Sequence, residues 1–340
     1  MTDEASRRAS LADVAAAAGV SAGTVSRVLS RRGDFSLATR RAVHDAATAL
    51  GYDRATTNRG RRAHTDPRLI ELVLGGLGGP WTHQVILGAH ERAFALGYDV
   101  VLTKERTDPA DDWPARVAAR RSSGVVFAII TPTRRQLDRL SDFAVPSVVL
   151  DPRSDTEPGV VTVGATNRQG GRDAARHLVA EGYERFVFAT TALRYRFGRA
   201  REQGFREELA RLLPRARVEL IDADWVGGVS RAGIRRLVEL SVDARLGVFA
   251  VNDAVAHTVV SAVLHAGRRV PDEIGVVGFD DDPRPPGGMP LSTIRQPIHD
   301  MAALAVELVD RLGRGEPLGN RQVELPTELV ARRSTASLGP

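Results

Sequence analysis

The chain has 340 residues, of which 43% are hydrophobic and 26% are charged. These proportions are typical of about two or three globular domains, and they exclude a disordered chain, collagen-like repeats and a small disulfide-stapled fold. Because the chain has no cysteine, disulfides, thiolate catalysis and cysteine-ligated metal centres are excluded as well.

The positive charge lies at the start of the chain. Up to His64 there are 11 arginines and 6 acidic residues, and since the whole chain has a net charge of +5, the remainder sums to zero. This asymmetry indicates a polyanion-binding head on a neutral body. The alternative is a solvated arginine face from a genome that favours arginine codons, because Lys104 is the only lysine.

The sequence also bears on location. No apolar run approaches the roughly 18 residues that a membrane helix needs. Residues 1–10 lack the apolar segment of a signal peptide. We therefore expect a cytoplasmic protein with no membrane segment.

Three short helices are predicted in the first 52 residues, each beginning at a serine. A serine hydroxyl at this position accepts a hydrogen bond from the first helical turn, and Gly19 ends the first helix. The second helix begins so soon afterwards that the two must cross steeply. The predicted helices cover residues 11–18, 22–29 and 37–50, and their caps are Ser10, Ser21 and Ser36.

The first two helices have the residue spacing of a helix-turn-helix, which is filled by Val14, Ala15, Ala18, Gly19, Val20, Val25 and Val28. The segment LADVAAAAGVSAGTVSRVLS, followed by a helix that ends in ALGY, resembles the amino-terminal domain of the LacI/GalR family of bacterial transcription regulators. The resemblance implies that this domain binds double-stranded operator DNA with its second helix in the major groove.

The outward residues of the second helix are the predicted DNA contacts, namely Ser21, Ala22, Gly23, Thr24, Ser26 and Arg27. Arg27 can bind the O6 and N7 atoms of a guanine, whereas the hydroxyl groups suit phosphates. Ala22 and Gly23 stand where the resembling family tends to carry base-reading side chains. We therefore expect direct readout that depends mainly on Arg27.

An arginine-rich linker, residues 53–67, is predicted next. In the resembling family a leucine of the corresponding hinge helix wedges into the minor groove, but Arg61 stands at that position here. One hypothesis is that Arg59, Arg61 and Arg62 hold the minor groove or the phosphates by charge. The alternative is a disordered, solvated linker.

From residue 68 onward, apolar runs alternate with amphipathic helical patterns. Such strands indicate parallel sheets covered on both faces, and the length suits two doubly wound lobes. The predicted strands are 70–74, 100–103, 125–130, 148–150, 186–189, 218–221, 247–251 and 274–279. The predicted helices include 85–96, 171–181, 204–213, 255–266 and 301–312.

This rhythm resembles the periplasmic sugar-binding-protein fold, which is the body of the LacI/GalR family. Local matches follow in order at 95–102, 167–171, 201–205, 251–253, 276–281 and 291–296. The implied fold class is α/β, with a helix-turn-helix domain (1–52), a linker (53–67) and a two-lobed, doubly wound body (68–340). By the same resemblance, one lobe covers about 68–153 and 295–321 and the other about 160–289 and 322–340, with crossings near 151–160, 290–296 and 321.

Ligands of doubly wound sheets bind beyond the carboxyl ends of the strands, here in the cleft between the lobes. Aromatic faces together with charged or amide groups suit a sugar. The candidates match the effector-binding positions of the resembling family and are Trp81, Arg201, Trp225, Asn252 and Asp280. Thr166 stands where the family usually has an aspartate, so the polarity of the effector can differ.

These candidates have structural alternatives. Trp225 can be a core aromatic, Asp280 can cap a turn, and Asn252 can staple a loop. A purely structural role is least favoured for Arg201, because an arginine at the start of a helix gains nothing from the helix dipole.

Catalysis is not supported by the sequence. The run Asp280-Asp281-Asp282 precedes prolines, no second carboxylate or histidine cluster stands at ligand spacing, and no Walker phosphate loop occurs. No cofactor or metal is implied. Two rivals are a pure solute-binding protein, which would need an export signal, and an enzyme with a fused helical domain.

The sequence therefore predicts a cytoplasmic, homodimeric transcription regulator, a repressor, that binds a near-palindromic operator and responds to a small polar ligand such as a sugar. Two heads are needed because one recognition helix buries too little surface to discriminate among genomic sites. By resemblance, the dimer surface includes the helix 85–96 and the strand after it.

Replacement of Arg61 by alanine tests the linker hypothesis. If Arg61 neutralises a DNA phosphate, its removal reduces the slope of log affinity against log salt concentration by about 1. The measurement is a fluorescence-anisotropy titration at several salt concentrations. An unchanged slope would indicate a solvated linker at this position.

Overall fold

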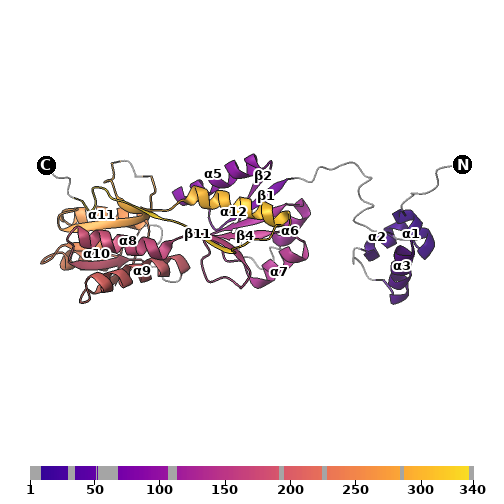
Figure 1. Ribbon diagram of the computed structural model, residues 1–340, viewed down its shortest axis with the longest axis horizontal. Coiled ribbons are helices and arrows are strands. Elements are labelled where there is room, and N and C mark those ends of the chain that lie inside the picture. The colour runs from indigo at the N-terminus through magenta and orange to yellow at the C-terminus, as the bar shows by residue number, and fades with distance from the viewer. Residues whose placement is uncertain are drawn as a thin grey trace. The chain divides into compact units, whose positions relative to one another are not determined.

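The computed structural model describes residues 9–29, 35–50, 52, 68–105, 113–190, 195–223, 228–283 and 287–336 (Figure 1). The chain divides into two compact units, residues 1–66 and 67–340. In these described ranges, no helix is long and apolar enough to cross a membrane.

The first unit contains the three predicted helices, α1 (Leu11–Ala18), α2 (Ala22–Leu29) and α3 (Leu37–Ala49). Ser10 and Asp13 form a capping box at the start of α1, and Gly19 ends this helix with φ of 66°, which glycine adopts without strain. The core of this unit is formed by Val14, Ala15, Val25, Val28, Val43, Ala46 and Ala47. The helix-turn-helix prediction is confirmed.

The second unit contains two six-stranded sheets, and each sheet with its helices is called a lobe below. The sheet of lobe 1 is parallel throughout and has the order β11-β5-β4-β3-β1-β2. Its strands are β1 (Leu69–Leu74), β2 (Asp99–Lys104), β3 (Gly124–Ala128), β4 (Ser147–Leu150), β5 (Val161–Ala165) and β11 (Gln322–Leu325).

The sheet of lobe 2 has the order β12-β10-β9-β8-β6-β7, and in it only β12 runs antiparallel to its neighbour. Its strands are β6 (Arg185–Ala189), β7 (Val218–Ile221), β8 (Leu246–Ala250), β9 (Ile274–Asp280), β10 (Ser292–Arg295) and β12 (Glu328–Val330). The central strands β8 and β9 are buried along their whole length, which is why they are continuous apolar runs in the sequence.

Helices cover the sheets on both faces. In lobe 1, α5 and α12 lie side by side on one face (Figure 1), while Trp113 of α6 and Leu140 of α7 pack on Phe127 and its neighbours on the other. The helices of lobe 1 are α5 (Pro80–Ala95), α6 (Trp113–Arg120), α7 (Arg134–Asp142) and α12 (Ile298–Gly313). Those of lobe 2 are α8 (Asn167–Ala180), α9 (Arg196–Leu212), α10 (Arg231–Leu240) and α11 (Asp253–His265). The predicted two-lobed, doubly wound body is confirmed.

Two of the three expected crossings between the lobes are wrong. Residues 161–165 and 322–325 belong to lobe 1, because β5 pairs with β4 and β11 pairs with β5. The chain therefore crosses after β5, again at 296–297 after β10, and finally at 326–327 between β11 and β12. Parallel neighbouring strands are usually joined by a helix, but β4 and β5 are joined by the loop 151–160. This is why the sequence predicts a crossing at that loop.

The buried carboxylate of Glu71 links β1 to its surroundings in lobe 1. It is 0% exposed and accepts hydrogen bonds from Thr103 Oγ1 and Ser122 Oγ, both at 2.8 Å, and from Arg120 Nε at 2.6 Å. A buried charge is tolerated only with such partners. Glu71 therefore couples β1 to β2, α6 and the loop before β3.

The variant Glu71→Ala is expected to destabilise the second unit by about 1–3 kcal/mol, because it leaves the partly exposed Arg120, the buried Ser122 hydroxyl and the half-buried Thr103 hydroxyl without their acceptor. Urea unfolding of the full chain measures this loss. The matched control is Asp138→Ala, whose ion pair with Arg134 lies exposed on α7 and whose loss is expected to leave the unfolding midpoint unchanged. Equal effects in the two variants would contradict the role given to Glu71.

Candidate functional site

The helix α2 presents a polar face to solvent. Val25 and Val28 are buried in the core of the first unit, so the predicted DNA contacts lie on the opposite side of the helix. Of these contacts, Thr24 and Ser26 are half-buried, and the exposed ones are Ser21, Ala22, Gly23 and Arg27. The Ser21 hydroxyl accepts from the Thr24 amide at 3.1 Å and bonds to the Thr24 hydroxyl at 2.9 Å. Arg27 Nε donates to a carbonyl of its own helix at 3.3 Å. The face is suited to a polyanion, and its role in DNA binding stays a prediction.

A cavity of about 230 Å³, called the cleft below, lies between the two lobes of the second unit. Its polar lining stands at the carboxyl ends of strands, as expected for doubly wound sheets: Asp151 follows β4, Asn252 lies just beyond β8, and Asp280 ends β9. Trp81, near the start of α5, and Arg201 of α9 also line the cleft. Four of the five predicted effector-binding residues therefore meet at one cavity.

Arg201 is the most deeply buried charge in the cleft, with 2% of its surface exposed. Its Nε donates to Asn167 Oδ1 at 2.8 Å and its Nη1 donates to the Val251 carbonyl at 2.6 Å. The guanidinium lies 3.6 Å from the centroid of the Phe279 ring, and Nη2 lies 3.7 Å from Asp280 Oδ1. Burial lowers the pKa of Arg201, while Asp280 opposes that shift.

Two glycines place Arg201 by allowing α8 and α9 to approach closely. A side chain at Gly171 of α8 would collide with the backbone carbonyl of Arg201, and one at Gly204 of α9 would collide with the carbonyl of Arg168. The backbones of α8 and α9 are therefore in direct contact, and this close packing places Arg201 at the floor of the cleft. Exposed ion pairs, such as that of Arg172 with Glu207 at 2.9 Å, line the edge of this contact.

The carboxyl groups of the cleft have perturbed acidities. Burial raises the pKa of Asp280 to about 7, although Arg201 opposes the shift. Burial likewise raises the pKa of Asp151 to about 6 and that of Asp282 to about 6. The neighbouring Asp253 is buried with a pKa raised well above its ordinary value, again by burial first. Asp151, Asp280 and Asp282 therefore change their charge near neutral pH.

The backbone turns sharply where these carboxyls stand. Asp280 and Asp281 have φ of 114° and 63°, a region that non-glycine residues adopt only when their surroundings fix them. Asp253 supplies part of that fixation, because it accepts from the Asp282 amide at 2.8 Å and from Thr293 Oγ1 at 2.7 Å. Gln296 Nε2 donates to Asp280 Oδ1. Such local strain is typical of binding sites.

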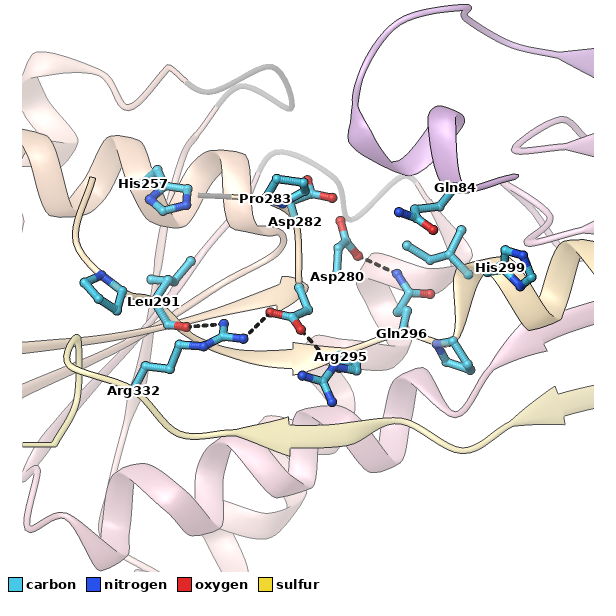
Figure 2. Close-up of a pocket in the computed structure, with 14 residues that line it drawn as sticks. Gln84, His257, Asp280, Asp282, Pro283, Leu291, Arg295, Gln296, His299 and Arg332 are labelled. Atoms are coloured by element: carbon cyan, nitrogen blue, oxygen red, sulfur yellow. Dashed lines mark hydrogen bonds and ion pairs between the residues drawn. The ribbon is translucent and has the colours of Figure 1, made fainter. Parts of the chain in front are cut away.

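Figure 2 shows a larger cavity of about 490 Å³ that shares Asp280, Asp282 and Gln296 with the cleft. Both oxygens of Asp281 are occupied there, by Arg295 Nε at 2.8 Å and by Arg332 Nη2 at 2.7 Å. Arg295 also pairs with Glu328 at 3.1 Å, so the two arginines are balanced by two carboxylates.

The remaining predicted residues have different outcomes. The side-chain oxygen of Asn252 accepts from the Val255 amide at 2.9 Å and caps α11, so the loop-fixing alternative is correct for that atom. Thr166 does not line the cleft; its hydroxyl accepts from the Thr327 amide at 2.9 Å and joins two crossing segments. Trp225, Arg59 and Arg61 lie outside the described residues.

Among the carboxylate and carboxamide side chains of the cleft, sequence reasoning missed Asp151, Asp282 and Gln296. Asp151 carries the same signal that identified Asp280, a carboxylate at the end of an apolar strand, and could have been found. Gln296 follows β10, which was not among the predicted strands, so its position had no signal beyond the matched segment 291–296.

The fold joins a helix-turn-helix domain, typical of DNA-binding regulators, to a body of the periplasmic-binding-protein type. Residues 10–55 match the family described as "Bacterial regulatory proteins, lacI family", and residues 175–335 match the periplasmic binding protein-like domain. The chain is 32% identical over 353 residues to an uncharacterized HTH-type transcriptional regulator of Streptomyces limosus. The match covers 97% of this chain and 95% of the relative. The chain belongs to the lacI family of bacterial regulatory proteins.

Two solved structures extend this likeness over almost the whole chain. One is the complex of the transcriptional regulator CelR with cellobiose, with a TM-score of 0.68, 27% identity and coverage of 96% of this chain and 100% of the other. The second is the lac repressor dimer bound to operator and an anti-inducer, with a TM-score of 0.69, 25% identity and coverage of 97% and 100%. The family consists of transcription regulators, so the interpretation of the chain as a regulator rather than an enzyme is confirmed.

The variant Gly171→Ala tests how Arg201 is placed. The added methyl group collides with the carbonyl of Arg201, so we expect α8 and α9 to separate and the second unit to lose about 1–3 kcal/mol of stability. Urea unfolding measures the loss. The control Gly319→Ala meets no atom within 4 Å and should change little. A Gly171→Ala protein as stable as the control would show that the close helix contact is not needed.

Proposed function

We propose that the protein is a cytoplasmic repressor that binds operator DNA as a homodimer. Its affinity for the operator changes when a small polar ligand, a sugar or a related metabolite, occupies the cleft. The observation that carries the proposal is the combination, in one chain, of a recognition helix with an exposed polar face and a cleft in which a fully buried arginine stands among ionisable carboxyls.

The ligand half of the proposal is supported by the composition of the cleft. Polar groups from both lobes converge on one cavity, and Trp81 adds an aromatic surface of the kind on which sugar rings stack. A ligand that contacts Asp151 in lobe 1 and Arg201 in lobe 2 binds best at one angle between the lobes. It therefore favours one conformation of the body over another.

The homodimer is supported by an apolar surface on lobe 1. Leu87 and Phe94 of α5 and Leu102 of the edge strand β2 are exposed, Phe94 by 76%. Exposed apolar surfaces of this kind mark interaction sites. A second copy that covers α5 and β2 would also supply the second recognition helix that a near-palindromic operator needs.

The DNA half of the proposal assigns the outward residues of α2 to the major groove, with Arg27 reading a guanine and the hydroxyls of Ser21, Thr24 and Ser26 near phosphates. Gly23 has open space around it, since a side chain there would meet only Ser21 Oγ, at 3.8 Å. The helix could thus carry a larger residue at this position. The present sequence leaves base reading mainly to Arg27.

The experiment is a fluorescence-anisotropy titration of the full chain with DNA from the region upstream of its own gene, at modest ionic strength. We expect Arg27→Ala to weaken operator binding by about tenfold or more while binding to unrelated DNA of equal length changes little. The control is Arg41→Ala, which removes the same charge from the exposed side of α3. Equal losses in both variants would mean that Arg27 acts only through its charge.

The same titration repeated with small polar compounds tests the ligand half. A thermal-shift screen identifies compounds that stabilise the second unit, and each hit is then added to the operator titration. We expect at least one hit to shift operator affinity by about fivefold or more. A protein that does not bind its own upstream region, with or without these compounds, would contradict the proposed function.

A further inference from the structure

The cleft is rich in hydrogen-bond acceptors that have no partner. Gln296 is 5% exposed, and its side-chain oxygen is buried without a hydrogen bond from the described part of the chain. The carboxylates of Asp151 and Asp282 also accept no hydrogen bond from the residues that the structure describes. An orphaned buried acceptor such as the Gln296 oxygen costs free energy, and the carboxylates of Asp151 and Asp282 line the cavity and are open to a ligand that donates.

The arginine donors of the cleft are largely committed. Two nitrogens of Arg201 are bonded to Asn167 and to the Val251 carbonyl, and the third lies 3.7 Å from Asp280. Arg153, at the adjoining cavity of about 310 Å³, is paired with Glu105 at 2.8 Å. No arginine described in or beside the cleft therefore presents an uncompensated charge to a ligand.

The charge balance points in the same direction. Asp151, Asp280 and Asp282 line the cleft against one cation, Arg201. The arginines of the neighbouring cavity, Arg295 and Arg332, share Asp281, and Arg295 also pairs with Glu328 at 3.1 Å, so two carboxylates balance the two arginines. An anionic ligand such as a sugar phosphate would meet repulsion here, and a cationic one would meet attraction.

We propose that the ligand of the cleft carries a protonated amino group, and that Asp282 and the Gln296 side-chain oxygen receive its hydrogens while Asp280 and Asp151 supply negative charge. In Figure 2, Asp280 stands between Asp282 and Gln296 and accepts a hydrogen bond from the Gln296 nitrogen, so the carboxylates of Asp280 and Asp282 form one acidic rim. An ammonium group has three donors and no acceptor, which suits this rim. The inference rests on the proposed function, because it assumes that the cleft binds the effector.

Two other occupants fit less well. A neutral sugar can donate from its hydroxyl groups, but it leaves the excess of negative charge uncompensated. A metal ion is disfavoured because no group of three histidine or acidic side chains among the described residues is arranged to hold one. The amino group therefore distinguishes this chain's ligand from the cellobiose held by its structural relative.

The acidities of the cleft give the proposal a pH signature. Burial raises the pKa of Asp280 to about 7 and that of Asp282 to about 6, so both lose charge on mild acidification. The charged or titratable groups around them are Arg201, Asp151, Asp253, Asp281 with its two arginines, and His257, whose pKa is lowered by burial. An ammonium binds the ionised carboxylates, so its affinity rises with pH between 5.5 and 7. A neutral sugar that accepts a hydrogen from a protonated carboxyl would show the opposite trend.

The test uses isothermal titration calorimetry of the full chain with D-glucosamine, D-galactosamine and D-mannosamine, each against its parent hexose and its N-acetyl form. We expect at least one amino sugar to bind about tenfold tighter than both neutral counterparts, and to bind more tightly at pH 7 than at pH 5.5. The proposal is overturned if no amino sugar exceeds its counterparts, or if affinity falls as the pH rises.

The variant Asp282→Asn separates charge from shape. It should weaken binding of the amino sugar by about tenfold and leave the parent hexose unaffected. The control Asp138→Asn removes an exposed carboxylate from α7 and should change neither. Equal losses for both sugars in Asp282→Asn would overturn the role of its charge, provided that thermal unfolding shows both variants folded. A neutral compound that binds and shifts the operator titration would leave the proposed function intact while this inference fails.

Discussion

The burial of one positive charge, that of Arg201, constrains the whole ligand-binding half of the molecule. Removing a guanidinium from water costs several kcal/mol unless partners replace the solvent. Those partners come from three elements: Asn167 starts α8, Val251 follows β8, and Phe279 and Asp280 end β9. Arg201 therefore fixes the carboxyl edge of the sheet in lobe 2, which is the edge that forms the floor of the cleft.

The segments that cross between the lobes are tied to this same region. Thr166 and Thr327 join the first and third crossings by a hydrogen bond of 2.9 Å, while Gln296, at the second crossing, donates to Asp280. A ligand that contacts Asp280 or Gln296 thus acts directly on a crossing segment. A change in the angle between the lobes must alter these contacts, which gives a physical route from occupancy of the cleft to the conformation of the body.

Much of the fold could be predicted because its signals are local. The serine caps and Gly19 define the helices of the first unit, and the buried parallel strands are continuous apolar runs. The strand β5 is also a buried apolar run, but nothing in that run shows which sheet it joins, whereas β11 is half exposed and its place depends on pairing with β5, far away in the sequence. Resemblance to a family located Trp81, Arg201, Asn252 and Asp280, but not the use of the Asn252 oxygen as a helix cap. That use is the structural alternative for Asn252, because asparagine is a common residue immediately before a helix.

Coupling between the cleft and the recognition helix is the central claim, and reciprocity tests it most directly. Operator affinity is measured with and without the compound that binds the cleft most tightly, and the affinity for that compound is measured with and without operator. If one protein conformation serves both sites, the two ratios are equal and differ from one by about fivefold or more. If both sites bind their ligands but both affinity ratios equal one, the cleft and the DNA-binding unit act independently.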